Sequence, residues 1–324
     1  MKGPYPRGIR NVVAVAAVAL LLPVGLEAAA AVRSVPAAAV GEMRVLVIRA
    51  TWGPTPGDEA RVAAELAEAA AFFRRASFGK LDVSFEITPW VRAYDNMAIC
   101  PTAEDEEDER RSALGAISRL ARIAAASAGY DPLAYDRVVF LLPDRVCGFP
   151  GLGVRGEVLL ANPNELSWLG IVHELGHTLG LAHATSSACA RGCRVLRYGD
   201  HLSPMGQGYV DFSAFEKNQL GWLSGTIAAR RSGSYAIGAV DDTTPLPQAL
   251  IVPAAHGEYW LEYGSQLARL VVRFVHRVDP RSPVQQSILL PRTLRAFTAR
   301  GVFTVRVTRV TDEDVVLAIR FVRR

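Results

Sequence analysis

The sequence is poor in lysine and cysteine and has no low-complexity segment. Of its 36 lysine and arginine residues only Lys2, Lys80 and Lys217 are lysines, and the arginines are scattered along the chain. Because no basic stripe is interleaved with aromatic residues, we expect no nucleic-acid partner. Hydrophobic residues make up 50% of the chain and charged residues 21%. That balance excludes a disordered or fibrous protein and predicts a globular one with a large core.

Long apolar runs are also rare, and the clearest one lies near the N-terminus. It covers eleven residues, 12–22, with Arg7 and Arg10 before it and small residues at 28–31 after it. A membrane anchor is the alternative, but spanning a bilayer takes roughly 20 residues. The pattern is typical of a cleaved secretory signal, here residues 1–30. We therefore expect a secreted protein, extracellular or periplasmic, without stable membrane insertion after signal cleavage.

Export changes the interpretation of the four cysteines, Cys100, Cys147, Cys189 and Cys193. An even number of cysteines in an oxidising compartment predicts two disulfides. We favour Cys189 with Cys193, which only three residues separate, and Cys100 with Cys147. A structural zinc site is the weaker alternative, because no C-x-x-C pair is present.

Sequence texture divides the mature chain into two expected domains, residues 31–224 and 225–324. In the first, apolar runs with strand character alternate with amphipathic helical segments, which predicts an α/β (α+β) domain with a mixed sheet. The expected strands are 44–48, 81–87, 137–142 and 157–160, and the expected helices are 59–75 and a stretch from the acidic run 104–109 to 125. After residue 225, short β-rich runs separated by turn residues predict an all-β, sandwich-like domain.

One eleven-residue stretch, H-E-L-G-H-T-L-G-L-A-H at 173–183, carries the chemistry. On a helix, His173 and His177 project from one face about one turn apart, as a pair of zinc ligands requires. Gly180 can end the helix in a left-handed conformation and return His183 as a third ligand. Three protein ligands leave a fourth position open for water, which distinguishes a catalytic Zn²⁺ site from a structural one.

Glu174 follows the first histidine and is the candidate general base. Its carboxylate can take a proton from water that attacks a carbonyl and pass it to the leaving amine. We expect Asn164 to cap the helix that carries this motif, with Glu165 at its positive end. The alternative, that these are ordinary helix histidines, does not explain why three of the six histidines fall in eleven residues.

The motif H-E-x-x-H-x-x-G-x-x-H, followed by a methionine in S-P-M-G at 203–206, resembles the metzincin clan of zinc peptidases. Within that clan the chain is most similar to the gametolysin-type metallopeptidases, through Y-G-D-H-L-S-P-M-G at 198–206, the run at 212–223 and E-Y-W-L-E-Y at 258–263. The resemblance implies a secreted zinc endopeptidase. It also implies that His173, His177 and His183 bind Zn²⁺, that Glu174 is the base, and that Met205 lies beneath the metal.

We therefore predict a zinc metalloendopeptidase that acts on protein or peptide substrates. Two alternatives remain: a zinc-stabilised binding or adhesion protein without catalysis, and a zinc amidase that cleaves a non-peptide, cell-wall amide. Clan architecture predicts that an extended peptide binds along an edge strand, for which we favour 157–160.

Three further features lie near the motif. G-x-G-x-x-G at 151–156 is not followed by a helix, so we interpret it as a loop that shapes the cleft and not as a dinucleotide site. Asp200 is expected to form a turn through its side chain. The resemblance also raises a tyrosine metal ligand, which some relatives have. Tyr209 is near the S-P-M-G turn but not at the expected offset, and Tyr198 precedes that turn, so we assign this role to neither.

Overall fold

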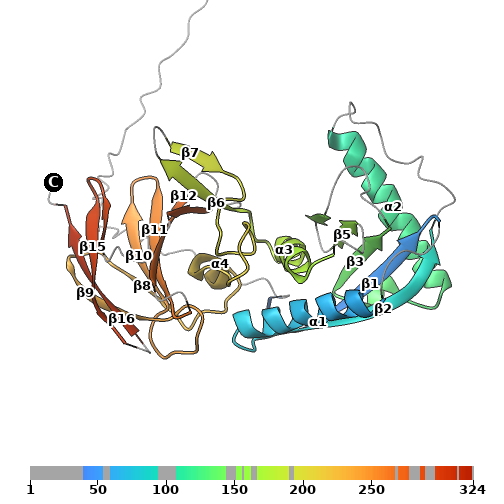
Figure 1. The fold of residues 1–324 in the computed structure, drawn as a ribbon, viewed down its shortest axis with the longest axis horizontal. Helices are drawn as coiled ribbons and strands as arrows, with labels where there is room; N and C mark the ends of the chain where they lie inside the picture. Colours follow the sequence, from blue (N-terminus) through green and yellow to red (C-terminus); the bar gives the residue numbers. More distant parts are fainter. Residues whose placement is uncertain are drawn as a thin grey trace, which may run out of the picture. The chain divides into compact units, whose positions relative to one another are not determined.

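The computed structural model describes the chain in segments: residues 39–53, 59–93, 107–143, 151–154, 157–161, 166–189, 193–266, 269–276, 285–288, 296–311 and 314–322. The signal segment expected at 1–30 lies outside these residues, as do Cys100 and Cys147. Within the described part, no helix has the length and apolar character that crossing a membrane requires. Helices and three sheets are present (Figure 1), which confirms the expected mixture of α and β structure.

The first sheet comprises β1 (Gly41–Thr51), β2 (Leu81–Arg92), β3 (Arg137–Leu142), β4 (Gly151–Val154) and β5 (Glu157–Ala161). Its strand order is β2-β1-β3-β5-β4. Strands β2, β1, β3 and β5 run parallel to one another, and β4 pairs antiparallel with β5 at one edge. β1 is buried along most of its length. A parallel strand covered on both faces needs apolar residues at successive positions, which explains the buried run V-L-V-I at 45–48.

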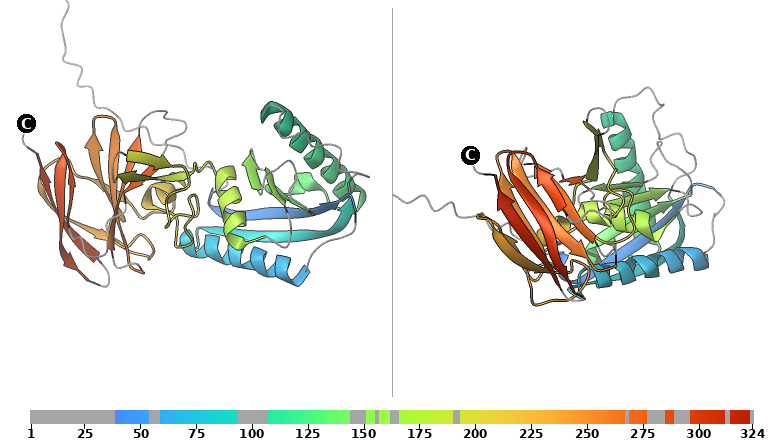
Figure 2. Two further views of the ribbon diagram at one scale, coloured as in Figure 1. Left: turned by 45° about the horizontal axis from the view of Figure 1, so that its top comes forward. Right: turned by 60° about the vertical axis from the view of Figure 1, so that its left-hand side comes forward.

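The helices are α1 (Glu59–Ala76), α2 (Glu107–Ser127), α3 (Trp168–Thr178) and α4 (Ala214–Gln219), with a short 3-10 helix at Pro132–Ala134. α1 and α2 lie on opposite sides of the first sheet (Figure 2). Val45 and Val47 of β1 pack in the core that contains α1 and α3. The alternate residues Leu46 and Ile48 pack in the core that contains α2. Successive side chains of β1 therefore point to opposite faces of the sheet and pack in two different cores, one of which includes α3.

The second sheet comprises β6 (Ala184–Cys189), β7 (Cys193–Leu196), β8 (Thr226–Ala228), β10 (Ala249–Ala254), β11 (Gly257–Gly264), β12 (Arg269–His276) and β13 (Gln285–Ile288). The third comprises β9 (Gly233–Gly238), β14 (Ala296–Ala299), β15 (Phe303–Val310) and β16 (Asp314–Phe321). Their orders are β7-β6-β13-β12-β11-β10-β8 and β14-β15-β16-β9. Leu261 and Val272 of the second sheet share one core with Phe303 and Leu317 of the third. Two sheets that share a core have the layering of a β-sandwich.

Every described element after residue 225 is a strand, in keeping with an all-β C-terminal domain, which stays a prediction. The hairpin of β6 and β7 lies before the predicted boundary yet pairs with β13 beyond it. Within the hairpin, Cys189 and Cys193 are partners in the backbone register. The predicted disulfide between them stays a prediction.

Two expectations about the first sheet are wrong. Residues 157–160 belong to β5, which pairs with β3 on one side and β4 on the other, so this strand is not an edge. The edge on this side of the sheet is β4, within the glycine-containing segment that we interpreted as a loop. The short glycine-rich run carries too little apolar periodicity to indicate a strand from sequence alone.

Candidate metal centre

Helix α3 carries the first two histidines of the motif. Ser167 caps its N-terminus, where the hydroxyl oxygen accepts a hydrogen bond from the backbone N–H of Gly170 at 3.2 Å. The expected cap, Asn164, lies outside the described residues, and the helix begins four residues after it. Ile171, Val172 and Leu175 are buried, so the apolar face of α3 packs on the first sheet. This packing directs the histidine face away from the core.

The end of α3 returns the third histidine to the helix. Gly180 has a φ of 92°, a left-handed conformation that costs glycine no side-chain clash. The N–H of Leu181 donates to the carbonyl of Gly176 at 3.0 Å, and the N–H of Gly180 donates to the carbonyl of His177 at 3.0 Å. These two bonds form a Schellman motif. The prediction that Gly180 ends the helix is confirmed.

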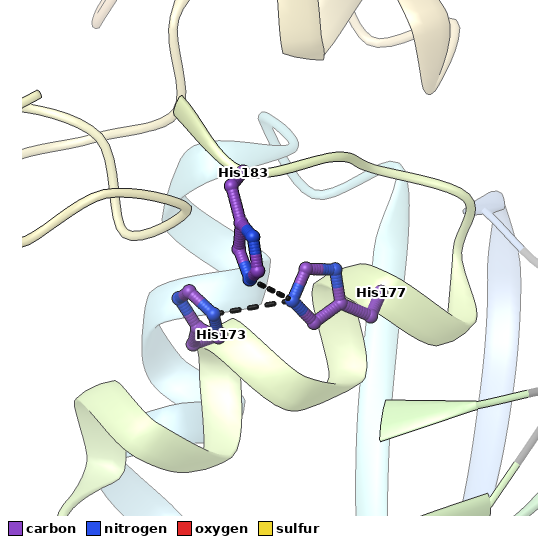
Figure 3. Close-up of side chains that lie close together, drawn as sticks. All are labelled: His173, His177 and His183. Carbon is purple, nitrogen blue, oxygen red and sulfur yellow. Dashed lines mark hydrogen bonds between the residues drawn. The ribbon is translucent and has the colours of Figure 1, made fainter. Parts of the chain in front are cut away.

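His173, His177 and His183 converge on one point (Figure 3). Each can offer one ring nitrogen, and these nitrogens all lie within 4.8 Å of one another. The Nε2 atom of His177 is 3.1 Å from Nε2 of His173 and 3.0 Å from Nε2 of His183. Three nitrogens this close are arranged to share a single cation.

Backbone carbonyls fix which ring nitrogen faces that point. Nδ1 of His173 lies 2.7 Å from the carbonyl oxygen of Pro204, and Nδ1 of His177 lies 2.8 Å from that of Leu181. A carbonyl oxygen only accepts hydrogen bonds, so in each ring Nδ1 carries the proton and donates it. Nε2 is then unprotonated and has a lone pair for a metal.

The electrostatics of the site also keep the rings neutral. Burial lowers the pKa of His173 and of His177 below the usual value. Burial together with the two neighbouring rings and Arg197 lowers the pKa of His183 to about 4. Imidazole binds a metal in its neutral form, so at neutral pH these rings need lose no proton to become ligands.

Two further residues of the motif region lie on or against α3. Glu174 follows His173 and is partly exposed. Met205 is fully buried, and a Cβ atom added at Gly176 would come within 2.5 Å of its Sδ. Met205 therefore packs closely against the helix that carries His173 and His177, on the side where only glycine leaves room.

The turn before Met205 behaves as its sequence predicts. Oδ1 of Asp200 accepts hydrogen bonds from the N–H groups of Leu202 at 2.9 Å and Ser203 at 3.2 Å. The prediction that Asp200 forms a turn through its side chain is confirmed. Oδ2 of Asp200 also pairs with Arg273 at 3.0 Å, which sequence analysis did not anticipate.

Tyr198 lies beside the histidines although its sequence offset gave no reason to expect it. Its ring centroid is 4.3 Å from that of His183 and 6.1 Å from that of His173, and the residue is 39% exposed. Tyr209 is 71% exposed. The β6–β7 hairpin returns the chain to the site at Tyr198, a consequence of strand pairing that motif spacing does not reveal.

The comparisons with known proteins agree with the site. No curated protein matches the chain. The model of the family described as gametolysin peptidase M11 matches residues 63–259, which is more than half of the chain and includes the three converging histidines. The chain therefore belongs to the gametolysin M11 family of metallopeptidases, whose substrates are proteins or peptides.

Proposed function

We propose that this chain is an exported, zinc-dependent endopeptidase of the metzincin type, in which His173, His177 and His183 bind the metal. The observation that supports this most strongly is the convergence of three histidine ring nitrogens, with the rings of His173 and His177 fixed by carbonyl acceptors. Three neutral imidazoles with a fourth position open match the donor set of catalytic zinc sites. When bound, zinc would supply a Lewis acid that polarises the peptide carbonyl and acidifies water.

Glu174 is the proposed general base. It follows a ligand directly on α3 and is partly exposed, so solvent and substrate can reach its carboxylate. The carboxylate takes a proton from the attacking water and returns it to the amine that leaves. The balance is one water consumed and one peptide bond replaced by a carboxylate and an amine.

We further propose that substrate binds along β4. This strand is one of the two edges of the first sheet, and it is the edge against which α3 packs. An extended peptide can add to such an edge through backbone hydrogen bonds, which fix its register without requiring a particular side chain. β4 therefore replaces 157–160 as the proposed binding strand.

The decisive experiment measures cleavage of an unfolded protein by residues 31–324, with and without chelator. Glu174→Ala is assayed in parallel with its bound zinc quantified, and Glu68→Ala on the exposed face of α1 serves as the carboxylate control. We expect chelator-sensitive cleavage in the parent and in Glu68→Ala. Glu174→Ala should hold zinc but show no cleavage.

Other results would favour the alternatives. One equivalent of bound zinc without turnover of any protein would favour the binding or adhesion protein. Release of cell-wall fragments without proteolysis would favour the amidase. Cleavage by Glu174→Ala at the parent rate would exclude Glu174 as the base.

A further inference from the structure

A cluster of buried charges surrounds the turn at residues 200–206, which contains Met205 and is called the methionine turn below. It consists of Asp200, Glu216 on α4, Glu262 on β11 and Arg273 on β12, each at most 3% exposed. Burying a charge is costly unless it is paired and hydrogen-bonded. Among these four side chains Arg273 is the one cation, and it is the counter-ion of Asp200 and Glu262.

Arg273 contacts two of these carboxylates directly. Its Nε donates to Oδ2 of Asp200 at 3.0 Å, and its Nη1 pairs with Oε1 of Glu262. Oε2 of Glu262 accepts from the backbone N–H of Ala214 at 2.6 Å, at the start of α4. A planar guanidinium can hold two carboxylates in fixed directions, which a single ammonium cannot. Arg273 thus links β11 and β12 of the second sheet to the methionine turn.

A continuous set of contacts leads from Arg273 to a proposed metal ligand. Asp200 holds the N–H groups of Leu202 and Ser203. The Ser203 hydroxyl accepts from the N–H of Met205 at 3.0 Å and donates to the Glu216 carboxylate at 2.8 Å. Pro204 lies between Ser203 and Met205, and its carbonyl accepts from Nδ1 of His173 at 2.7 Å. The position of that carbonyl therefore depends on a turn whose polar groups are satisfied by the buried cluster.

We propose that Arg273 is a positioning residue for the metal centre, which it orders through Asp200 and the Pro204 carbonyl that orients His173. The inference rests on the proposed metal site. It assigns a role in that site to a residue of β12, Arg273, which lies 73 positions from Asp200 along the chain. Partners that orient a ligating histidine typically change metal affinity by about 10–100-fold when removed. Arg273 acts at one further remove, and its loss also leaves Asp200 and Glu262 buried without their counter-ion.

The test measures Zn²⁺ affinity of the full chain by competition with a chromogenic chelator, and the absorption spectrum of the Co²⁺-loaded protein. Arg273→Met should weaken Zn²⁺ binding by about tenfold or more and alter the Co²⁺ spectrum. Arg273→Lys should recover part of the loss, because it restores the charge without the two-pronged geometry.

Arg49→Met is the matched control. Arg49 is also buried and ion-paired, to Glu59 at 2.7 Å, but it lies on β1 and its side chain donates to the carbonyl of Thr88 on β2. This variant should lose stability yet keep the parent Zn²⁺ affinity and Co²⁺ spectrum. Equal losses of affinity in Arg49→Met and Arg273→Met at matched stability would overturn the proposal.

Asp200→Asn keeps the proposal testable if Arg273→Met does not fold. The asparagine carbonyl still accepts from the turn, but the carboxylate that Arg273 holds is gone. We expect weaker Zn²⁺ binding in this variant also; parent affinity and an unchanged Co²⁺ spectrum would overturn the proposal. Because these readouts need no substrate, a parent that binds Zn²⁺ without cleaving peptides would refute the proposed function and leave this inference standing.

Discussion

Single side chains in this site are oriented by backbone groups of other segments. The imidazole of His173 is held by the carbonyl of Pro204, and that of His177 by the carbonyl of Leu181. Both acceptors come from segments that follow α3, so the helix alone does not orient its own ligands. The contact between α3 and Met205 must therefore be close enough to fix the turn against the helix.

Gly176 tests how close that contact is. Gly176→Ala places a methyl group 2.5 Å from Sδ of Met205. The flexible thioether must move, so we expect a loss of about 1 kcal/mol or more in the free energy of unfolding and several-fold weaker Zn²⁺ binding. Gly115→Ala on α2 is the control, because nothing lies within 4 Å of its added Cβ. That substitution should stabilise by up to ~1 kcal/mol, and the same gain in Gly176→Ala would mean that Met205 has room to spare.

Glu216 gives the fold a dependence on pH. Its pKa is raised from 4.5 to about 7, chiefly by burial and also by Asp200, while Arg273, Ser213 and Ser203 oppose the shift. Between these two values the folded chain holds a proton that the unfolded chain releases. The contribution to stability is therefore fully present below pH 4.5 and is lost as the pH rises through about 7.

Glu216→Gln removes this titration. The variant should become more stable relative to the parent as the pH rises from 5 to 8, measured by urea unfolding with the metal removed. Comparing the two proteins at each pH cancels the contributions of the histidines, whose lowered pKa values act in the opposite direction. A difference in unfolding free energy that is constant between pH 5 and 8 would contradict the assignment.

Among the secondary-structure elements, β4 is the strand that we propose binds substrate. Adjacent residues of an edge strand direct their N–H groups alternately to the neighbouring strand and outward. Of Leu152→Pro and Gly153→Pro, one therefore breaks pairing with β5 and the other removes an outward donor. The variant that loses the outward donor should lower kcat/KM for peptides by about tenfold, which corresponds to roughly one lost hydrogen bond, while its zinc content stays unchanged.

Thr298→Pro in β14 is the control for this pair. β14 is an edge strand of the third sheet, so a proline there should leave peptide cleavage unaffected. If both β4 variants cleave peptides at the parent rate with full zinc content, substrate does not add to β4.

Local sequence patterns predicted the histidine motif and most of the helices and strands of the first domain. The edge of the sheet and the ion pair between Asp200 and Arg273 depend on contacts between distant segments, which local patterns do not report. The spacing of His173, His177 and His183, with Gly180 between them, is a local signal that needs only helix geometry and one turn. Which strand lies at the sheet edge depends on the pairing of β4 with β5, and no periodicity reports that. The link from Asp200 to Arg273 joins residues 73 positions apart, so no motif spacing could have indicated it.

Across the whole chain, the two predicted domains share contacts that the boundary near residue 224 would cut. Phe215 of α4 packs edge-on against Trp260 of β11, with ring centroids 5.4 Å apart. The two rings belong to an apolar cluster that also includes Val240 and Val275. Glu262 accepts from the N–H of Ala214, and Arg273 pairs with Asp200. The C-terminal sheets thus complete the surroundings of α4 and the methionine turn.

A chain that ends at residue 224 tests this dependence and the predicted boundary together. Truncation exposes Phe215, removes the counter-ion of the fully buried Asp200, and leaves the β6–β7 hairpin without its partner β13. We expect residues 31–224 to bind Zn²⁺ at least about tenfold more weakly than residues 31–324, with a lower unfolding temperature, because removing one partner of a buried ion pair alone costs about 3–5 kcal/mol. Circular dichroism melting and chelator competition on both chains measure this. A truncated chain with the parent's affinity and a cooperative melt would show that residues 31–224 form a self-sufficient domain, and the C-terminal sheets would then have to serve something other than the metal centre.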